Sequence, residues 1–535
     1  MSKHNGDVLD YAIVGGGVSG IYSGWRLLND SEGATPSVAL FESSGRMGGR
    51  LLSVIPPHIP SGRVELGGMR YIEKVQSWVT SLVEHLGLET ESLAADQPQN
   101  LTYVRGKHLR MSELTDATQV PYALRPEESS ENDLGNLTAV AAMRALGPAI
   151  EKLLGKKIER WEDLADLSPD DWKKVAEEGT FEGTPLYELP MRYLMLRTIS
   201  HEAFRMARDT GGYDSIHHTW NAADGFCWNV GDYGPNVEYL HVKEGYQQLP
   251  LTLLQQYEKQ GALHMNTRLK GFDAEDDGTL VLDMEGPEGP MTVRARHLIL
   301  GMPRRSLELL EPRGPVLDPT NTKVQALIRS VTPIPLFKLA ICYAEPWWEK
   351  VDPKIKDGKS VTDLPVRQCY YWKVDPDTNH AVILIYDDGI DLDYWAGLRD
   401  SSAPSFANDL PADMDLPDWS DFPAPRRMVE EVHRQLVELH GNPPDVPDPY
   451  AAAYRDWGDD PYGGGANFWP VGVKSYEVTE AMVHPDPRYK VYVCGDCYSH
   501  GQGWVEGALG TAELMLQKHL GLEKPTWKKY DDHPA

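Results

Sequence analysis

The sequence predicts an α/β fold, α+β over the whole chain, and three observations support it. The apolar run Tyr11 to Val14 leads through Gly15-Gly16-Gly17-Val18-Ser19-Gly20 into a stretch with helical spacing. A second apolar run, Ser37 to Phe41, ends on the acid Glu42. Strand patterns with Asp-Gly and Gly-Pro turns return between residues 263 and 303, and again near the end of the chain. Together they predict a Rossmann-like domain that is discontinuous along the chain.

The glycines fit the spacing G-x-G-x-x-G, and each has a physical reason. Gly15 allows the tight turn, Gly17 lets the backbone approach a pyrophosphate, and Gly20 lets the helix pack on the strand. The helix N-terminus offers free N–H groups and a positive dipole end to phosphates. Glu42 can accept hydrogen bonds from both ribose hydroxyls. The alternative is a glycine-rich turn with a purely structural role.

Two further segments indicate which dinucleotide binds. Gly45-Arg46-Met47-Gly48-Gly49-Arg50 follows the acid, and Glu65-Leu66-Gly67-Gly68-Met69-Arg70-Tyr71 comes soon after. A nicotinamide site does not need a second glycine–arginine turn, whereas a longer, fixed cofactor can use the two arginines near its phosphates. A surface turn without phosphate is the alternative. At this point the sequence resembles the flavin amine oxidase family, in which the second segment passes beside the flavin ring.

The chain of 535 residues is too long for one core, so several domains are expected. Residues 123–239 read as a helical insertion, with helices over Ala139 to Leu154, interrupted at Gly147-Pro148, and over Met191 to Ala207. The expected FAD-binding domain takes residues 8–68, 240–330 and 486–535. The expected substrate-binding domain, built on a mixed sheet, takes residues 69–122 and 331–485.

Composition limits the classes of partner. With 52 Lys and Arg against 80 Asp and Glu, the net charge of −28 disfavours nucleic acid and anionic membranes. No apolar run reaches membrane-spanning length and no signal peptide is visible, so a soluble, cytoplasmic protein is expected. Five cysteines do not suggest a disulfide scaffold, and Cys494-Gly-Asp-Cys497 is expected to be a strand-end turn and not a redox pair.

The resemblance extends over the whole chain, because its motif clusters near 15–70, 335–372 and 494–509 occur in the family's order. Gly495-Asp496 and Gly503-Trp504-Val505-Glu506-Gly507-Ala508 are expected to aim a helix N-terminus at the flavin, where it stabilises the reduced ring. Lys338, the one charge on an apolar strand, is implied to reach flavin N5 through water; snorkelling at a sheet edge is the alternative.

One segment indicates the substrate. Gly358 to Tyr371 resembles L-amino-acid oxidases within this family, in which the second tyrosine of the pair, Tyr371, and Arg70 hold the substrate carboxylate. The resemblance implies hydride transfer from Cα to flavin N5, release of a 2-oxo acid and ammonia, and reoxidation by O2 to hydrogen peroxide. The FAD is expected to be non-covalent, and the protein a homodimer or higher homo-oligomer.

The side-chain pocket is expected within the helical insertion, which offers Asp214, His217, His218, Trp220, Asp224 and Trp228. This mixed set favours a broad range of neutral amino acids, including aromatic ones, with basic amino acids as the runner-up. Three other functions stay open: an amino-acid monooxygenase that decarboxylates its substrate to the amide, an oxidase of polyamines or other amines, and a non-enzymatic flavoprotein scaffold.

The expected site can be written residue by residue. The flavin contacts are Gly15, Gly17, Val18, Ser19, Gly20, Glu42, Ser43, Arg46, Gly49, Arg50, Gly67, Gly68, Met69, Arg70, Leu269, Gly495, Asp496, Gly503, Trp504, Val505 and Ala508. The catalytic residues are Lys338, Arg70, Tyr371 and Trp504, and the substrate contacts are Arg70, Tyr371, Trp504, Gly503, Trp220 and His218. No metal site is expected.

Overall fold

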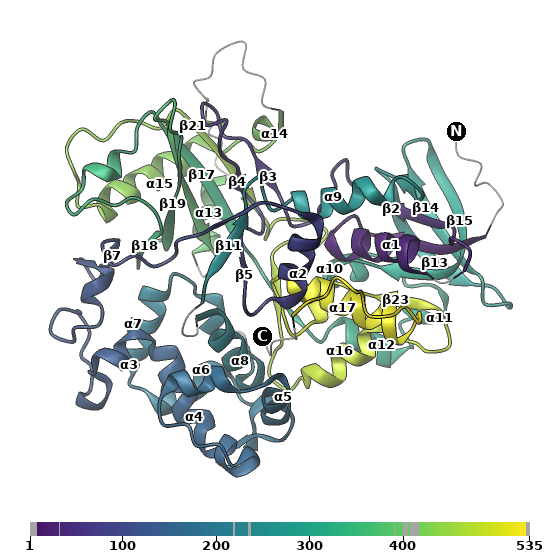
Figure 1. Cartoon of the computed structure of the whole chain (residues 1–535), viewed down its shortest axis with the longest axis horizontal. Helices are drawn as coiled ribbons and strands as arrows, with labels where there is room; N and C mark the ends of the chain where they lie inside the picture. Colours follow the sequence, from purple (N-terminus) through teal and green to yellow (C-terminus); the bar gives the residue numbers. More distant parts are fainter. Residues whose placement is uncertain are drawn as a thin grey trace.

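The structure is a computed structural model that describes residues 8–31, 33–217, 220–233, 237–389, 391–399, 405–406 and 417–530. It confirms a mixed α/β architecture built on two seven-stranded sheets and a group of helices. In Figure 1 one sheet lies on the right, the other at the upper left, and the helical group at the lower left.

The first sheet brings together strands from three separate stretches of the chain. Its parallel part is β12 (Ala262–His264), β2 (Val38–Phe41), β1 (Leu9–Val14), β15 (Gly289–Leu300) and β23 (Val491–Val493). Strands β14 (Leu280–Gly286) and β13 (Arg268–Ala274) extend it antiparallel. The parallel strands are buried apolar runs, as expected for strands covered on both faces.

Helices cover this sheet and share one apolar core. They are α1 (Val18–Asp30), α2 (Ser77–Leu86), α9 (Gln248–Tyr257) and α17 (Val505–Lys518), and their buried residues form one cluster with β1 and β2. Figure 1 shows the purple N-terminal helix beside the yellow C-terminal helix on this sheet. The carboxyl ends of β1 and β15 lie near the start of α17. In open α/β sheets, ligands bind at the carboxyl ends of the strands.

The second sheet is mixed. Its order is β21 (Ala451–Asp456), β17 (Phe337–Tyr343), β20 (Ala381–Asp387), β19 (Gln368–Val374), β18 (Lys359–Thr362), β7 (Leu101–Val104) and β8 (Lys107–Arg110). One face packs against α15 (Arg426–Leu439), whose buried residues cluster with those of β17 and β20. The opposite face packs on the segment around Leu66 and Met69.

The helical group lies between residues 131 and 233 and has its own core. Its helices are α3 (Glu131–Gly135), α4 (Leu137–Leu154), α5 (Pro169–Glu178), α6 (Met191–Thr198), α7 (His201–Gly211) and α8 (Ala222–Tyr233). The expected interruption of the first long helix is wrong, because α4 runs through Pro148. Packing against α5, α6, α7 and α8 outweighs the hydrogen bond that proline cannot make.

Shorter elements join these parts. One small sheet has three strands: β5 (Tyr71–Ile72), β11 (Tyr239–Val242) and β6 (Thr90–Ser92). Three further sheets have two strands each: β3 (Ser53–Val54) with β4 (Val64–Glu65), β9 (Thr180–Phe181) with β10 (Thr184–Pro185), and β16 (Thr332–Ile334) with β22 (Ala466–Phe468). The remaining helices are α10 (Arg304–Glu308), α11 (Gly314–Leu317), α12 (Thr322–Ile328), α13 (Leu392–Arg399), α14 (Pro417–Ser420) and α16 (Ser475–Val483).

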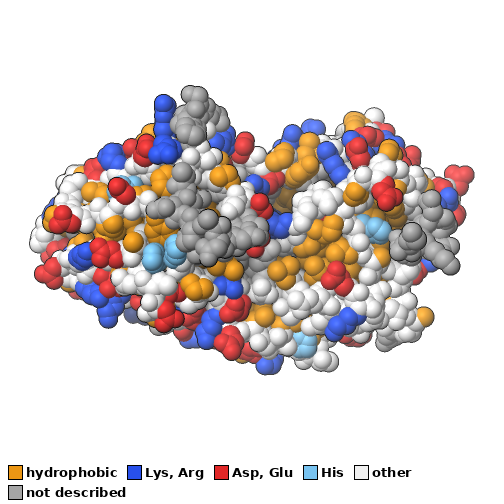
Figure 2. Space-filling view, turned by 90° about the horizontal axis from the view of Figure 1, so that it is seen from above, with side chains coloured by type: hydrophobic (Ala, Val, Ile, Leu, Met, Phe, Trp, Pro, Cys, Tyr) orange, Lys and Arg blue, Asp and Glu red, His pale blue; other side chains and the backbone are white. Residues whose placement is uncertain are grey.

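The surface agrees with the sequence in its charge pattern. On the face in Figure 2, acidic and basic side chains are interspersed. Within the described ranges, no helix combines the length and apolar character needed to cross a bilayer. All five cysteines, Cys494 and Cys497 among them, are free thiols. The bounds given above for the three domains stay a prediction.

Candidate active site

A cavity of about 490 Å³ lies where the two sheets and the helical group meet. This volume is within the usual range for a site that encloses a small molecule or cofactor. Every expected flavin contact except Gly20 lines the cavity. The site is therefore assembled from segments at the start, the middle and the end of the chain.

The glycine turn fits a close approach of phosphates. Gly15 has φ +114°, and a Cβ there would lie 2.3 Å from the carbonyl oxygen of Gly301. A Cβ on Gly20 would lie 2.0 Å from the carbonyl oxygen of Gly15, so this third glycine packs helix on strand beneath the cavity. No side chain caps the start of α1, whose first N–H groups can bind a phosphate.

Glu42 lies at the end of β2 and lines the cavity. Its Oε2 accepts a hydrogen bond from the backbone N–H of Gly16 at 2.7 Å, and its Oε1 accepts one from the N–H of Ser44 at 2.8 Å. These two bonds fix the carboxylate and leave lone pairs for ribose hydroxyls. Ser43, Thr267 and Leu269 continue the wall at this end.

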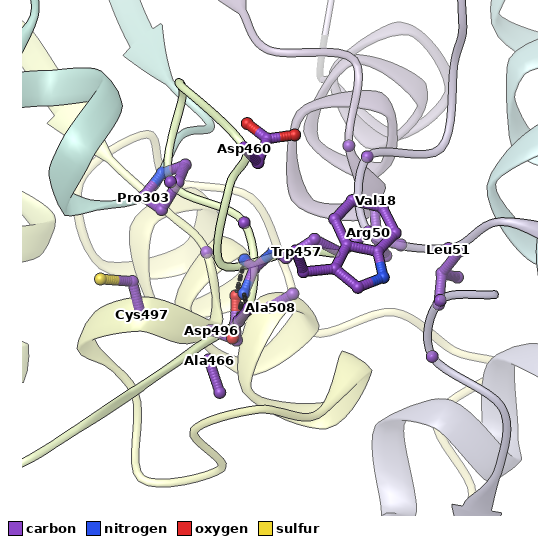
Figure 3. A pocket seen from close by; sticks show the side chains of 18 of the residues that line it. Val18, Arg50, Leu51, Pro303, Trp457, Asp460, Ala466, Asp496, Cys497 and Ala508 are labelled. Carbon is purple, nitrogen blue, oxygen red and sulfur yellow. Dashed lines mark hydrogen bonds and ion pairs between the residues drawn. The ribbon is translucent and has the colours of Figure 1, made fainter. Parts of the chain in front are cut away.

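The two arginines of the second turn brace the backbone and line the cavity. Arg46 donates to the carbonyl oxygen of Leu51 at 2.8 Å. Arg50 pairs with both carboxylate oxygens of Asp496 and donates to the carbonyl oxygen of Gly465 at 2.8 Å. Figure 3 shows the Arg50–Asp496 pair beside Trp457. It joins the N-terminal turn to the C-terminal motif across the cavity.

The C-terminal motif presents the start of α17. Gly495 has φ +142°, a conformation that favours glycine, and Asp496 also accepts from the N–H of Gly503 at 3.2 Å. Trp504 is the N-cap of α17, and Val505 and Ala508 of its first turns line the cavity with it. A helix N-terminus thus faces the cavity, as expected for stabilising negative charge.

Lys338 projects from β17 into the cavity wall and is 3% exposed. It donates to the carbonyl oxygen of Gly67, and its Nζ lies 4.6 Å from the centre of the Tyr386 ring. Burial lowers the pKa of Lys338. The same burial raises the pKa of Glu65, whose carboxylate accepts from the N–H of Tyr246 at 2.7 Å.

Arg70 lies in a polar pocket of tyrosines at one end of the cavity. Its guanidinium carbon lies 3.8 Å from the centre of the Tyr239 ring, and its Nη1 donates to the hydroxyl of Tyr370 at 3.3 Å. No carboxylate of the described residues lies within ion-pair distance of it, although Asp232 lines the same cavity and helps to raise the pKa of Arg70. The pairing with Glu65 that a structural arginine would make does not occur. A buried guanidinium without a protein carboxylate is suited to bind the carboxylate of a ligand.

The structure places Tyr370, and not the expected Tyr371, beside Arg70. The hydroxyl of Tyr371 lies 2.7 Å from Ser360 Oγ and 2.8 Å from His440 Nε2, in the core that α15 covers. Neighbouring residues of a strand point to opposite faces, so Tyr370 faces Arg70 when Tyr371 does not. The hydroxyl of Tyr370 also lies 3.4 Å from that of Tyr213, so Tyr370 contacts two cavity-lining residues, Arg70 and Tyr213, without lining the cavity itself.

The helical insertion supplies one wall through Tyr213, Ser215, Ile216 and Trp228. Trp220 does not reach the cavity: its ring stacks on Phe468 at 3.5 Å between centres, and Phe468 forms the wall instead. His218 lies outside the described residues. The predicted contact of Trp220 with the substrate does not fit its position in the structure. Trp228, on the following helix α8, lines the cavity, and Trp220 packs behind Trp228.

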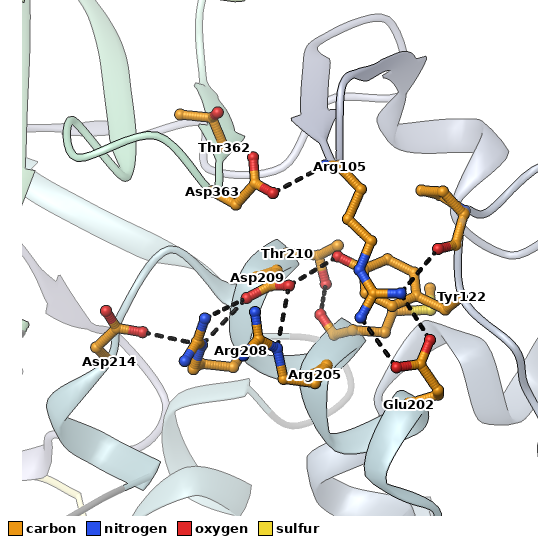
Figure 4. Close-up of polar contacts among 12 residues, drawn as sticks. Arg105, Tyr122, Glu202, Arg205, Arg208, Asp209, Thr210, Asp214, Thr362 and Asp363 are labelled. Carbon is orange, nitrogen blue, oxygen red and sulfur yellow. Dashed lines mark hydrogen bonds and ion pairs between the residues drawn. The ribbon is translucent and has the colours of Figure 1, made fainter.

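The segment 213–216 is held by a polar network around α7. Figure 4 shows Arg105 paired with Glu202, and Arg208 placed between Asp209 and Asp214. Next to it, Asp388, which directly follows β20 of the second sheet, lines the cavity and accepts from the N–H of Asp214 at 2.8 Å and from Ser215 Oγ. Burial raises the pKa of Asp388 to about 6. The cavity wall thus contains buried acids, Asp388 and Asp232, as well as aromatic rings.

Several lining residues escaped the sequence analysis. They include Trp457, Asp460 and Tyr462 from the loop after β21, Arg455 of β21, Tyr386 of β20, and Phe422 before α15. The glycine run Gly463 to Gly465, which also lines the cavity, was the one local signal for this loop. The other side chains reach the site through tertiary packing alone.

Comparisons with known proteins agree with this geometry. The model of the family described as flavin containing amine oxidoreductase matches residues 18–514. Aplysianin-A of Aplysia kurodai is 26% identical, over 99% of this chain and 94% of that protein. An L-amino-acid oxidase of Sistrurus catenatus edwardsii is 22% identical over 93% of this chain and 84% of that protein. The solved cyclohexylamine oxidase of Brevibacterium oxydans IH-35A is similar in fold, with a TM-score of 0.63, 18% identity, and coverage of 96% and 99% of the two chains.

Proposed function

The chain belongs to the flavin containing amine oxidoreductase family, and from that premise we propose that it is an FAD-dependent L-amino-acid oxidase. Bound FAD supplies the two-electron acceptor, and O2 reoxidises it. The overall reaction converts an L-amino acid, O2 and water to a 2-oxo acid, ammonia and hydrogen peroxide. An L-amino-acid oxidase is among the similar proteins, which supports this choice within the family.

One observation carries the proposal: Arg70 is buried beside the cavity and hydrogen-bonded to Tyr370, and no carboxylate of the described residues lies within ion-pair distance of it, Asp232 acting on it only from further away. A planar guanidinium can hold a substrate carboxylate through two parallel hydrogen bonds. A simple amine has no group that would need this site. The aromatic rings that line the cavity, Tyr213 beside Tyr386 and Trp228 beside Phe468, suit neutral side chains, aromatic ones included.

Lys338 and the start of α17 have supporting roles in this proposal. The ammonium of Lys338 is held beside the carbonyl of Gly67, in the segment expected to run along the flavin ring. A cation there attracts the negative charge that develops on O2 during reoxidation. Trp504 closes the cavity next to the helix N-terminus, which favours the negatively charged reduced ring.

The test compares two substrates that differ only in the carboxylate. The wild-type enzyme should oxidise L-phenylalanine with a kcat/KM at least about a hundredfold above that for phenethylamine, because two charge-assisted hydrogen bonds are lost with the amine. Peroxide and 2-oxo acid are measured for the first substrate, and peroxide and aldehyde for the second. Equal efficiency would assign the protein to amine oxidation.

A second candidate, an oxidase of basic amino acids, is favoured by Asp388 and Asp232 in the cavity wall. A buried carboxylate can bind the cationic end of lysine or arginine. Peroxide formation from L-lysine and L-arginine, measured beside L-phenylalanine in the wild type and in Asp388→Asn, separates the candidates. A loss confined to the basic substrates in the variant supports the second.

A further inference from the structure

Glu506 is a buried acid in the motif that faces the flavin, yet the function above gives it no role. It is the second residue of α17 and 9% exposed. Trp504, Val505 and Ala508 around it line the main cavity, and Glu506 does not. It lines instead a much smaller cavity of about 10 Å³ behind Trp504, together with Gln76. Its carboxylate is therefore turned away from the ligand.

The carboxylate binds the start of another helix. Its Oε1 accepts from the N–H of Trp78 at 3.0 Å and lies 3.3 Å from Ser77 Oγ, and its Oε2 accepts from the N–H of Val79 at 2.9 Å. These are first-turn groups of α2, whose N-cap residue makes no side-chain cap. First-turn N–H groups need an acceptor, and a carboxylate at a helix N-terminus also complements the dipole. Glu506 thus caps α2 from the first turn of α17.

From this geometry we propose that Glu506 is a positioning residue for the flavin. By holding the start of α17 against the start of α2, it fixes the segment Gly503 to Val505 at the cavity. The α2 N–H groups also neutralise a negative charge that would otherwise oppose the positive end of α17. The inference rests on the FAD cofactor of the family and is independent of the substrate.

The C-terminal segment holds the same junction from outside. Lys528 Nζ donates to Ser77 Oγ at 2.8 Å and lies 4.6 Å from the centre of the Trp78 ring. The backbone N–H of Lys529 donates to Ser81 Oγ at 3.2 Å, one turn further along α2. The start of α2 is therefore fixed on both sides, so a shift at Glu506 must be absorbed by α17.

The experiment uses the full chain and a matched control on the same helix. Glu513, also buried, pairs with Arg26 at 2.7 Å and hydrogen-bonds to Tyr22 and Gln517, and none of these three partners lines the cavity. Glu506→Ala, Glu506→Gln and Glu513→Gln are purified, stripped of FAD and titrated with FAD. The dissociation constant, the visible absorption bands of the bound flavin and the thermal unfolding midpoint of the apoprotein are measured for each.

Glu506→Ala should raise the FAD dissociation constant roughly tenfold or more and shift the flavin bands, because charge-assisted hydrogen bonds between the helices are lost. Glu506→Gln should recover part of the affinity, since its amide oxygen can still accept from α2. Glu513→Gln should lower the unfolding midpoint and leave affinity and bands near wild type. Unchanged affinity in Glu506→Ala, or losses in all three variants that only follow their unfolding midpoints, would overturn the proposal.

Discussion

At the scale of single residues, the site depends on which side chains face Arg70. Two adjacent tyrosines on β19 have the same chemistry and opposite surroundings. Tyr370 is bonded to Arg70, and Tyr371 to Ser360 and His440 on the other side of the sheet. The pair therefore offers its own control for the carboxylate proposal.

Arg70→Met should lower kcat/KM for L-phenylalanine about a hundredfold or more, because a substrate carboxylate would be buried without its charged partner. Tyr370→Phe should cost about tenfold or less, the value of one hydrogen bond. Tyr371→Phe should stay within about twofold of wild type, since its hydroxyl contacts Ser360 and His440 and makes no hydrogen bond with Arg70. Steady-state kinetics of the purified, FAD-loaded variants give these values. A larger loss in Tyr371→Phe than in Tyr370→Phe would contradict the placement of the two rings.

Tyr370 and Tyr371 also show which part of the site could not be predicted from the sequence. The glycine turn and Glu42 are local, because the turn, the strand and the helix that define them are contiguous in the chain. The face on which a strand residue lies depends on register and bulges set by its partners, and the register of β19 on β20 shifts between Tyr371 and Lys373. Arg455 and Asp460 reach the cavity by packing between distant segments, which no local pattern encodes.

At the scale of elements, α15 ends on a buried histidine. His440 is the C-cap of α15; its Nδ1 lies 2.6 Å from the carbonyl oxygen of Leu436, and its Nε2 lies 2.8 Å from the hydroxyl of Tyr371. Burial lowers the pKa of His440 to about 4; Arg110 and His108 lower it further, and the Leu436 carbonyl opposes this. The neutral ring is therefore the form that the folded protein holds.

The sign of the pH effect follows from the lowered pKa. Below pH 6.5, the ordinary pKa of histidine, His440 takes up a proton in the unfolded chain but stays neutral in the folded chain. The free energy of unfolding therefore falls as the pH falls from 6.5 toward 4. This one group should cost about 2 kcal/mol of unfolding free energy between pH 7 and pH 5. Urea unfolding at both pH values should show a smaller loss in His440→Gln than in wild type. An equal loss in both proteins would show that the folded protein accepts the proton.

At the scale of the whole molecule, the cavity lies between the two sheets, and residues of both line it. Arg50 and Asp496 link the start and the end of the chain at its wall, while Lys338 and Arg455 come from the second sheet. A cofactor in this position stabilises the folded protein by mass action, because the unfolded chain has no such site.

Acid precipitation should release the yellow cofactor, since FAD is expected to be held by non-covalent contacts alone. Returning FAD to the apoprotein at about 100 times its dissociation constant should add about 2.7 kcal/mol of stability and raise the unfolding temperature. Differential scanning fluorimetry against FAD concentration measures this rise. Colour that remains in the acid pellet would indicate covalent attachment.

The late position of β23 in the sequence has a consequence for synthesis on the ribosome. Strand β1 and the glycine turn emerge first, and β15 follows them, but the edge of β15 that pairs with β23 stays open until residues 491–493 have been translated. Asp496 and the start of α17 follow still later. A nascent chain can therefore form the glycine turn early but cannot close the flavin site, so FAD capture has to wait until α17 has been translated. Until then an apolar strand edge is exposed, which is the kind of surface that chaperones shield.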